Sequence, residues 1–341
     1  MVSAGWGKGA PPEVSVVVSS YGRAGFLAGL LEALEAQELG VEKFEVVLVD
    51  NGSPDGTWAA LQGALSRTGI RLLAVRLDRN AGAGGGRDAG LELARGTVVA
   101  FTDDDCLPAP GWLAALTGPL LGPDQAPTVV QGRTLPWPED GPACGPWART
   151  VWVEEPTWLF ETCNIAYRRA DLLGAGGFAG AGEAPRGATG RAFGEDALLG
   201  WAVVGAGATL VFQPGALVHH RHLPASYPQW LGELRGRGGF PALVGRSPFG
   251  RRALWHRFFL APRTAATDLA LVGLTLGLRR GRRGRRVWLL ALLPWLVLAL
   301  PEARGRTGRR LPVRLAQLAL GDLVGQAWLA AGSVRHRTVV L

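Results

Sequence analysis

The segment Thr97-Val-Val-Ala-Phe-Thr-Asp-Asp-Asp105 joins an apolar run to three consecutive carboxylates. The run from Thr97 to Phe101 is typical of a buried strand, and Pro108-Ala-Pro-Gly-Trp112 predicts a turn soon after it. Carboxylates at the end of a buried strand are costly unless a cation lies against them. Asp-x-Asp spacing can bind a divalent metal, which in turn can bind phosphates. Taken alone, however, such a triplet is more often a solvated loop or a helix cap.

Three strand-like segments precede this one and alternate with helical patterns. Each expected strand is nearly continuous in Val, Leu and Ile, which is typical of a parallel sheet with helices on both faces. Ligands of such sheets bind beyond the carboxyl ends of the strands. The expected strands are 14–19, 44–50, 70–77 and 97–101, and the expected helices are 26–36, 57–65 and one that includes 89–94.

Aromatic or acidic residues follow several of these strands. Tyr21 follows the first strand, Asp50 ends the second, and the triplet 103–105 follows the fourth. Three strand ends with such residues are harder to attribute to chance than one acidic triplet. We therefore expect a ligand site at this edge of the sheet.

A glycine-rich run, Asn80-Ala-Gly-Ala-Gly-Gly-Gly-Arg-Asp-Ala-Gly90, lies between the third strand and the helix after it. The backbone N–H groups of glycines can approach an anion closely, and Arg87 adds a positive charge. A dinucleotide-binding fingerprint would instead follow the first strand, where Tyr21-Gly-Arg23 stands. On its own, such a run is more often a flexible loop.

Charge divides the chain into two parts. Residues 225–341 carry 20 arginines, no lysine and four acidic residues, a formal charge of +16, whereas the whole chain carries +8. Residues 1–224 therefore carry −8. This asymmetry predicts one domain over 1–224 and a basic, apolar helical region with a different partner over 225–341. The three cysteines have no paired spacing and predict no disulfide framework.

The motifs of residues 12–224 together resemble the inverting family 2 glycosyltransferases. The resemblance lies in the order and spacing of Val-Ser-Val-Val-Val-Ser-Ser-Tyr-Gly-Arg23, Val-Val-Leu-Val-Asp-Asn-Gly-Ser-Pro-Asp-Gly-Thr57, the glycine-rich run and Phe-Thr-Asp-Asp-Asp105. It implies a GT-A fold, in which a mostly parallel sheet flanked by helices binds a nucleotide and carries a metal-dependent Asp-x-Asp site.

The resemblance also implies roles at the strand ends. Tyr21 would pack near the nucleobase, and Asp50 would hydrogen-bond its edge. Arg87 would lie near the diphosphate, and Asp103 would face the ribose or the sugar. The family often has Asn after this arginine, where this chain has Asp88. The expected donor-binding residues are Ser19, Tyr21, Arg23, Asp50, Asn80, Gly82, Arg87, Asp103 and Asp104.

A divalent cation, Mg²⁺ or Mn²⁺, is the cofactor that the resemblance implies, with Asp105 and Asp103 as ligands. Three histidines fall at 219, 220 and 222 after an expected strand, and such a cluster favours a metal ligand. The resemblance points to His220, with His222 second. A zinc site is the alternative, but the spacing of the cysteines does not support it.

The acceptor side is expected around Phe193-Gly-Glu-Asp196, which opens an apolar helix. Acids at a helix N-terminus commonly act as caps. The resemblance instead implies that Asp196 is the catalytic base, because an inverting transfer needs a carboxylate to accept the proton of the acceptor hydroxyl. Glu195 would support the loop or bind acceptor. A strand is expected over 159–169 and a mobile loop over 179–192, and the expected acceptor contacts are Asn164 and Trp201.

The C-terminal region contains two apolar runs, 269–278 and 287–300, on either side of an arginine cluster at 279–286. Both runs are shorter than the roughly 20 residues that span a bilayer. If both spanned, the six arginines of this cluster would lie outside, against the positive-inside tendency. We therefore expect an amphipathic helix and turn over 226–243 and then interfacial or re-entrant helices on anionic lipid. A packed helical subdomain or a dimer interface is the alternative, and the apolar content argues against nucleic acid.

These observations predict a metal-dependent inverting glycosyltransferase at the cytoplasmic face of a membrane, peripheral or re-entrant. The donor would be a nucleotide sugar, most often UDP-linked in such folds, and the acceptor a glycan, a lipid-linked sugar or a small molecule. A nucleotidyltransferase is one alternative, although its glycine-rich loop should follow the first strand. A non-catalytic nucleotide-sugar-binding membrane protein is another, and the set Asp103, Asp105 and Asp196 argues against it.

Overall fold

The computed structural model describes residues 1–5, 10–122, 126–140, 144–185, 192–279, 281–305 and 311–341. The chain forms two compact units. The first, called here the sheet unit, comprises Met1–Pro138, Thr150–Glu183 and Gly194–Arg221. The second, the helical unit, comprises Glu139–Arg149, Ala184–Phe193 and His222–Leu341.

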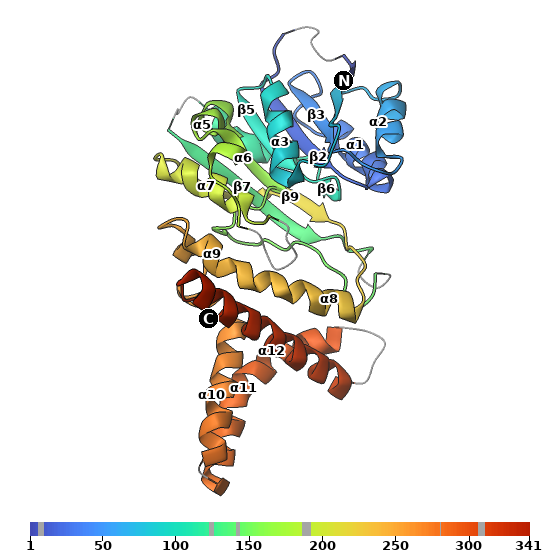
Figure 1. Ribbon diagram of the computed structural model, residues 1–341. Coiled ribbons are helices and arrows are strands. Elements are labelled where there is room, and N and C mark those ends of the chain that lie inside the picture. The colour runs from blue at the N-terminus through green and yellow to red at the C-terminus, as the bar shows by residue number, and fades with distance from the viewer. Residues whose placement is uncertain (6–9, 123–125, 141–143, 186–191, 280, 306–310) are drawn as a thin grey trace. The chain divides into compact units, whose positions relative to one another are not determined.

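The described residues of the sheet unit contain one nine-stranded β-sheet (Figure 1). Its strands are β1 (Val2–Ala4), β2 (Val14–Ser20), β3 (Phe44–Asp50), β4 (Arg71–Arg76), β5 (Val98–Thr102), β6 (Cys106–Pro108), β7 (Thr128–Pro136), β8 (Asn164–Arg168) and β9 (Thr209–His220). Their order across the sheet is β1-β4-β3-β2-β5-β8-β7-β9-β6.

The two halves of this sheet differ in strand direction. The neighbours β4, β3, β2 and β5 run parallel, as the alternating sequence pattern predicts. In the other half, β8 is antiparallel to both β5 and β7, and β6 is antiparallel to β9, whereas β7 and β9 are parallel. The α/β fold with helices flanking the sheet is therefore confirmed, and most of its parallel pairs lie in the N-terminal half, where β1 at the edge is antiparallel to β4.

Helices cover both faces of the sheet (Figure 1). Successive side chains of a strand point to opposite faces. In β2, Val14, Val16 and Val18 are fully buried and pack with residues of helices α1 (Leu27–Glu35), α2 (Thr57–Leu65) and α4 (Trp112–Leu121). Val17, on the other face of the sheet, packs against helix α3 (Gly82–Leu93). The helices of the sheet unit are η1 (Ala24–Phe26), α1 (Leu27–Glu35), α2 (Thr57–Leu65), α3 (Gly82–Leu93), α4 (Trp112–Leu121), α5 (Arg169–Gly174), α6 (Gly177–Gly180) and α7 (Glu195–Gly205).

The glycine-rich run belongs to α3 and does not form a loop before the helix. Each interior glycine costs about 1 kcal/mol of helix stability relative to Ala. Close packing on β2 explains their presence, because a Cβ atom on Gly86 would lie 2.1 Å from Ser19 Oγ and one on Gly90 would lie 2.5 Å from Val17 Cγ1. The run therefore lets α3 approach the sheet closely.

The strand expected over 159–169 is shorter in the structure, because β8 begins only at Asn164. Phe160 lies in the left-handed region with φ 54°, which no extended strand tolerates. The Asn164 backbone N–H donates to the Glu161 carbonyl at 3.3 Å, so a turn precedes the strand. Apolar content alone did not reveal this turn.

The helical unit contains α8 (Tyr227–Glu233), η2 (Leu234–Gly239), α9 (Phe240–Val244), η3 (Gly250–Ala253), α10 (Pro262–Arg279), α11 (Gly281–Gly305) and α12 (Leu311–His336). The amphipathic helix and turn expected over 226–243 correspond to α8 and α9 with a 3₁₀ segment between them. Glycines favour this break. One apolar core of the unit contains Trp147, Trp295, Ala299 and Leu318.

The expectation that both C-terminal apolar runs are too short to span a bilayer is wrong for the second run. In the described residues, Arg286–Gly305 forms one continuous helical stretch that is long and apolar enough to cross a membrane, and only 17% of its apolar window is buried. Pro294 and Pro301 lie inside α11 without ending it. Residue 280, the side chains of 279–285 and residues 186–191 lie outside the description, so the arginine cluster and much of the expected mobile loop cannot be compared with the structure.

Candidate active site

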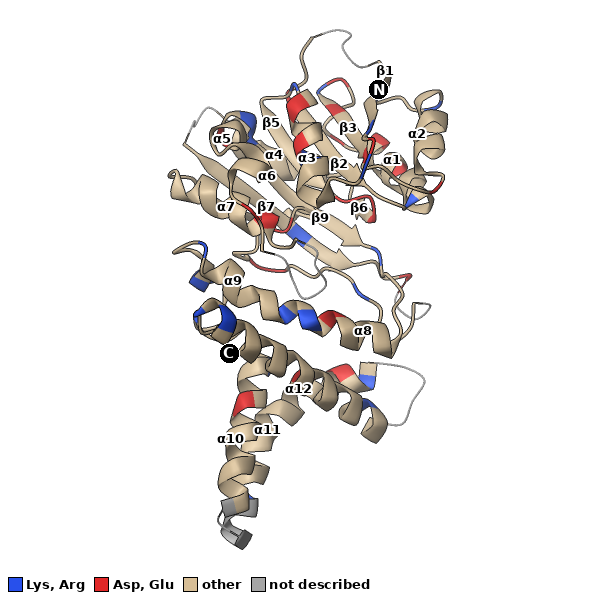
Figure 2. Ribbon diagram, viewed as in Figure 1, with Lys and Arg blue, Asp and Glu red and all other residues tan. Residues whose placement is uncertain are grey.

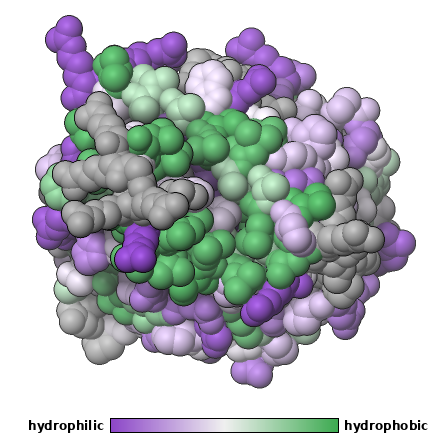
Figure 3. Space-filling model, turned by 90° about the horizontal axis from the view of Figure 1, so that it is seen from below, coloured by the Kyte–Doolittle hydropathy of each residue, from purple (hydrophilic) through white to green (hydrophobic). Residues whose placement is uncertain are grey.

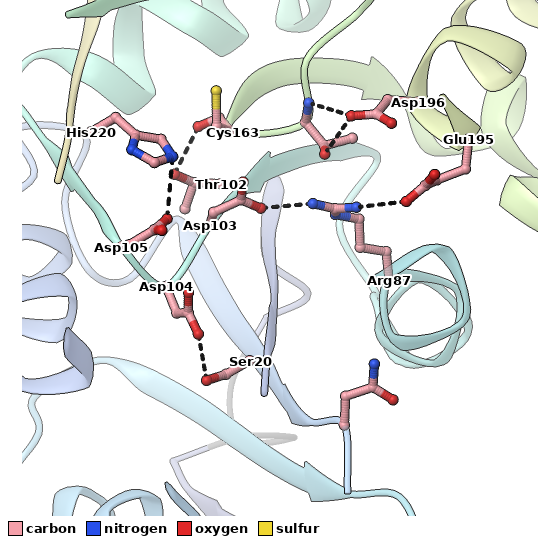
Figure 4. Close-up of polar contacts among 12 residues, drawn as sticks. Ser20, Arg87, Thr102, Asp103, Asp104, Asp105, Cys163, Glu195, Asp196 and His220 are labelled. Atoms are coloured by element: carbon pink, nitrogen blue, oxygen red, sulfur yellow. Dashed lines mark hydrogen bonds and ion pairs between the residues drawn. The ribbon is translucent and has the colours of Figure 1, made fainter. Parts of the chain in front are cut away.

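The acidic triplet forms the turn between β5 and β6 (Figure 4). The Cys106 backbone N–H donates to the Asp103 carbonyl at 3.2 Å and closes this turn. The Thr102 hydroxyl donates to the Cys163 carbonyl at 2.9 Å, which ties the end of β5 to the chain just before β8. Because β6 pairs with β9, the turn also brings the triplet beside His220 at the end of β9.

Arg87 of α3 connects Asp103 with the acidic start of α7 (Figure 4). Its Nη2 atom lies 2.7 Å from Asp103 Oδ1, and its Nη1 atom lies 3.9 Å from Glu195 Oε1. Burial by itself lowers the pKa of Arg87, but the carboxylates of Asp103 and Asp196 outweigh burial and raise it. The guanidinium is therefore charged, and it neutralises acids from two different elements.

Asp104 is held inside the fold by Ser20 and Arg23. The Ser20 hydroxyl donates to Asp104 Oδ2 at 2.6 Å, and Arg23 Nη1 lies 2.8 Å from Asp104 Oδ1. Burial raises the pKa of Asp104 to about 6, against the opposing effect of the Arg23 charge. Both oxygens have protein partners, so Asp104 anchors the triplet to the end of β2.

Asp105 lies between Arg23 and His220. Arg23 Nη1 is 2.5 Å from Asp105 Oδ2, and His220 Nε2 is 3.4 Å from Asp105 Oδ1. Oδ1 is buried and has no hydrogen-bond partner among the described residues. Burial raises the pKa of Asp105, and the His220 and Arg23 charges oppose this rise. A buried carboxylate oxygen without a partner is costly and points to a missing cation or donor.

His220 faces this oxygen with a nitrogen that is able to bind metal. Its Nδ1 atom lies 2.8 Å from the Arg221 carbonyl oxygen. That carbonyl can only accept, so Nδ1 carries a proton, and whenever the ring is neutral Nε2 offers a free lone pair. Asp105, Cys106 and His220 offer ligand atoms within 4.8 Å of one another, and carboxylate and imidazole groups are both common ligands of divalent cations. The chemistry of these residues therefore fits a divalent cation.

The predicted base, Asp196, lies in the first turn of α7 but accepts its hydrogen bonds from elsewhere (Figure 4). Its Oδ2 atom accepts from the Thr162 backbone N–H at 3.4 Å and from the Thr162 hydroxyl at 3.2 Å. The residue at the N-cap is Gly194, which has φ +76° and no side-chain cap. Asp196 is thus bonded to Thr162, while both acids also lie in the first turn of α7, where they complement the helix dipole.

Glu195, next to the predicted base, is buried beside Arg87. Burial, and then the Asp196 charge, raise the pKa of Glu195. Its Oε2 atom has no hydrogen-bond partner among the residues that the structure describes. The carboxyl group therefore has one oxygen free for a proton or a ligand hydroxyl.

The other expected donor residues line the ends of β2 and β3. Tyr21 is 46% exposed, whereas Asp50 is fully buried. Asp50 Oδ1 accepts from the Ser53 backbone N–H at 2.9 Å, and Arg76 Nε lies 3.4 Å from Oδ2. Asn80 Oδ1 accepts from the Gly82 N–H at 2.8 Å, just before α3. Ser19 is packed under Gly86 of α3.

Asp88, which departs from the family pattern, is bonded to the backbone of α6. Its two carboxylate oxygens accept from the backbone N–H groups of Phe178 and Ala179, at 2.8 and 2.9 Å. Both groups belong to α6, so Asp88 satisfies the free N–H groups at the start of that helix. The extra negative charge therefore has a structural use.

The two expected acceptor contacts are used within the fold. Asn164 is 1% exposed, accepts from Trp112 Nε1 at 2.8 Å, and donates to the carbonyls of Arg133 and Ala216 at 2.8 Å each. Trp201 is 2% exposed and donates to the Trp158 carbonyl at 2.8 Å. The structure does not bring either side chain to the site. His222 is likewise absent from the cluster of ligand atoms found in the described residues.

Four residues of the site were not predicted from the sequence. Ser20 anchors Asp104, Thr162 holds Asp196, and Cys106 lies opposite His220. Glu161 is buried near Asp196, and burial raises its pKa. Ser20 could have been found, because it precedes Tyr21 at a strand end, but the partners of Asp196 lie too far along the chain for any local pattern to reveal them.

Comparison with known proteins supports the resemblance over the first part of the chain. Residues 15–139 match the family model for glycosyl transferase family 2. Glycosyltransferase AglE of Haloferax volcanii is 36% identical over 103 residues, which are 30% of this chain and 33% of that protein. The undecaprenyl-phosphate 4-deoxy-4-formamido-L-arabinose transferase of Pseudomonas aeruginosa is 44% identical over 94 residues, 27% of each chain. The matched segment thus spans about a third or less of these relatives.

A solved structure shows the same fold over a longer stretch. Mannosyltransferase PcManGT from Pyrobaculum calidifontis, solved in complex with GDP-Man and Mn²⁺, aligns with a TM-score of 0.57. The alignment covers 96% of this chain and 88% of that one at 20% sequence identity, so the likeness is one of fold. The predicted resemblance to the family 2 glycosyltransferases is therefore confirmed over residues 15–139, and the chain has the GT-A type of fold.

Proposed function

We propose that this protein is a glycosyltransferase that moves a sugar from a nucleotide-sugar donor to an acceptor hydroxyl, with inversion at the anomeric carbon. The observation that carries the proposal is the position of Arg87. Its guanidinium contacts Asp103 of the triplet and lies 3.9 Å from Glu195 beside the predicted base. The donor side and the acceptor side of the site would thus both lie beside the guanidinium of Arg87. This would bring the two substrates together, as a displacement between them requires.

The donor would bind along the ends of β2, β3 and β5. Tyr21 offers an exposed ring to a base, and Asp50 keeps one carboxylate oxygen without a hydrogen bond. Arg87, Arg23 and the N-terminal end of α3 with Asn80 and Gly82 would face the diphosphate, since cations and helix N-termini favour phosphates. Ser19, Asp103 and Asp104 would complete this side. The complex of PcManGT contains GDP-Man, and a UDP-linked sugar remains our first choice here.

The cofactor would be Mg²⁺ or Mn²⁺, held by Asp105 and His220 with Asp103 nearby. The partnerless Asp105 oxygen and the free His220 Nε2 support this assignment. When bound, the cation would stabilise negative charge on the departing diphosphate.

Asp196 would act as the base. Its carboxylate would accept the proton of the acceptor hydroxyl while the acceptor oxygen bonds to the anomeric carbon and the bond to the diphosphate breaks. The hydrogen bonds from Thr162 to Oδ2 fix the carboxylate and leave its other oxygen for the acceptor. Glu195 would help to position the acceptor.

The acceptor is proposed to be lipid-linked, and the protein to work at the cytoplasmic face of a membrane. The matching Pseudomonas aeruginosa protein is named for undecaprenyl phosphate, which is a lipid phosphate. In the helical unit, α10 and α11 are mostly uncharged between their ends (Figure 2). Hydrophobic side chains gather on the face seen from below (Figure 3), and exposed apolar residues of these helices include Val272, Leu278, Leu289, Leu290, Leu293 and Val297.

A thermal-shift screen of nucleotide sugars with and without Mn²⁺ or Mg²⁺ tests this function, because ligands that bind the native state raise its apparent stability. We expect one nucleotide class to raise Tm only when the cation is present, and Asp105→Ala to abolish that increase. A full set of UDP-, GDP- and dTDP-linked sugars that leaves Tm unchanged under every condition would contradict the proposal.

A further inference from the structure

Arg23 lies against two carboxylates of the acidic triplet, next to the place where a divalent cation would bind. A single nitrogen, Arg23 Nη1, lies 2.8 Å from Asp104 Oδ1 and 2.5 Å from Asp105 Oδ2. We infer that the Arg23 guanidinium takes the place of a divalent cation at Asp105 and must withdraw when the cation binds, so that it weakens binding of the cation alone. This inference rests on the proposed function, which places the cation at Asp105 and His220.

The geometry lets the side chain of Arg23 leave without disturbing the fold. The Arg23 side chain is 34% exposed, whereas its two partners are 3% and 2% exposed, so the guanidinium sits on the outer side of the carboxylates. Its backbone N–H donates to the Thr57 hydroxyl at 3.2 Å and would hold the main chain in place. Rotation of exposed side chains is fast compared with motions of the backbone.

Electrostatics makes the guanidinium and the cation competitors. Asp105 Oδ1 faces His220, but Asp105 Oδ2 is taken by Arg23. A cation at Oδ1 would share one carboxylate with the guanidinium, and like charges at such short range repel strongly in a partly buried site. Without a cation, Arg23 is the only described basic residue that forms an ion pair with Asp104, and removing it would leave buried negative charge.

A nucleoside diphosphate would give Arg23 a second partner. Guanidinium groups pair well with phosphate oxygens, so Arg23 could exchange the carboxylates for the diphosphate as the cation arrives. Cation and nucleotide would then strengthen the binding of each other by the same factor, as linkage requires. Arg23 would act as a positioning residue that disfavours a cation without its donor.

Binding of Mn²⁺ alone to the full chain tests the inference, with free Mn²⁺ measured by electron paramagnetic resonance. Arg23→Gln should bind Mn²⁺ more tightly than the wild type, on the order of tenfold, because a unit charge near the site is lost. Arg23→Lys keeps the charge and should stay close to the wild type. Arg133→Gln is the matched control, because the Arg133 side chain is 39% exposed and pairs with Glu154 and with no residue of the triplet among the described ion pairs. Addition of UDP or GDP should tighten Mn²⁺ binding more in the wild type than in Arg23→Gln.

A second measurement on the wild type does not depend on whether Arg23→Gln folds. Modification of arginines by phenylglyoxal, followed by mass spectrometry, should show Mn²⁺ increasing the reactivity of Arg23 relative to Arg133. Unchanged or weaker Mn²⁺ binding in Arg23→Gln, or protection of Arg23 by Mn²⁺, would overturn the inference and leave the proposed function standing. If no variant binds Mn²⁺ even with nucleotide, the proposed cation site fails, and the inference fails with it.

Discussion

Two buried groups of charges, one in each unit, differ in how completely their polar atoms are bonded. In the helical unit, Arg263 Nε donates to Asp322 Oδ1 and Trp295 Nε1 donates to Asp322 Oδ2, at 3.0 and 2.8 Å. Arg263 also pairs with Glu302. Within the described residues, none of these three charged side chains has a buried nitrogen or oxygen without a hydrogen bond. This group joins α10, α11 and α12.

The group in the sheet unit is incomplete by the same measure. Asp105 Oδ1, Arg87 Nε and Glu195 Oε2 are buried without hydrogen-bond partners among the described residues. Each such atom costs free energy, so a fold retains several of them together only where something compensates. The comparison teaches that the bonded group of Arg263, Glu302 and Asp322 holds three helices together, while the unbonded atoms around Asp105 point to a ligand.

The largest effect is expected from removing the predicted base. Asp196→Asn should lower the rate of sugar transfer by about 10²–10⁴-fold, the usual contribution of a general base. The cation-dependent Tm increase with donor should remain, because Asp196 is not among the proposed donor contacts. Transfer assays beside thermal shifts check both. Glu92→Gln, an exposed acid on α3, is the control, and normal turnover of Asp196→Asn would refute the base.

The comparison itself is tested by one substitution in each group. Asp322→Asn should destabilise the protein by about 1–3 kcal/mol, because Arg263 loses one of its two carboxylate partners and keeps only Glu302. Asp105→Asn should cost much less in the absence of cation, since Arg23 keeps Asp104. Denaturant unfolding of the full chain in mild detergent measures both. Equal losses in the two variants would show that the two groups do not differ in the way described.

A third prediction concerns the apolar surface of the helical unit. Leu290 and Leu293 of α11 are 67% and 51% exposed. Replacing both by Asn should weaken flotation with anionic vesicles at least about tenfold, since burying one Leu contributes roughly 1.5–3 kcal/mol. Leu173→Asn changes a comparably exposed leucine of the sheet unit, 47% exposed, and should have no effect. Undiminished flotation of the double variant would separate α11 from membrane binding.

The smallest effect is expected from changing Glu161, a hydrogen-bonded acid close to the incomplete group of charges in the sheet unit. Its Oε2 atom accepts from Gln131 Nε2 at 2.8 Å and from the Thr157 hydroxyl. Burial raises the pKa of Glu161, so the folded protein holds this proton more tightly than the unfolded chain. Stability should therefore fall as pH rises from about 4.3, the usual pKa of Glu, through the raised value.

Glu161→Gln should remove this part of the fall. Urea unfolding across that pH range measures the difference, and Glu92→Gln again serves as the exposed control. An identical pH dependence in wild type and Glu161→Gln would show that the carboxyl group titrates alike in the folded and unfolded states.

The strands that place the site were predictable because their signal is local. Continuous apolar runs predicted β2, β3 and β5, and the acidic triplet directly follows the end of β5. Long-range pairing was not predictable in the same way. Asp105 meets His220 only because β6 pairs with β9, and Arg23 meets the triplet only because β2 and β5 are neighbours.

Residues that look functional by position can instead be structural. Asn164 begins β8, a short strand beside β5, yet it joins Trp112, Arg133 and Ala216 in the core. A sequence gives the polarity of a side chain but not how many hydrogen bonds the fold already supplies. The same limit applies to Asp88, whose carboxylate accepts hydrogen bonds from backbone N–H groups at the start of α6.

The glycines of α3 have a consequence for how the site comes to exist. A helix with so many glycines has little tendency to form by itself, because each one costs about 1 kcal/mol and a short isolated helix is already marginal. It can be stable only once Ser19 and Val17 are in place beneath it. Arg87 therefore reaches Asp103 only where α3 is packed on β2, and exchanging Gly86 for Ala, which strengthens most helices, would here push α3 and β2 apart.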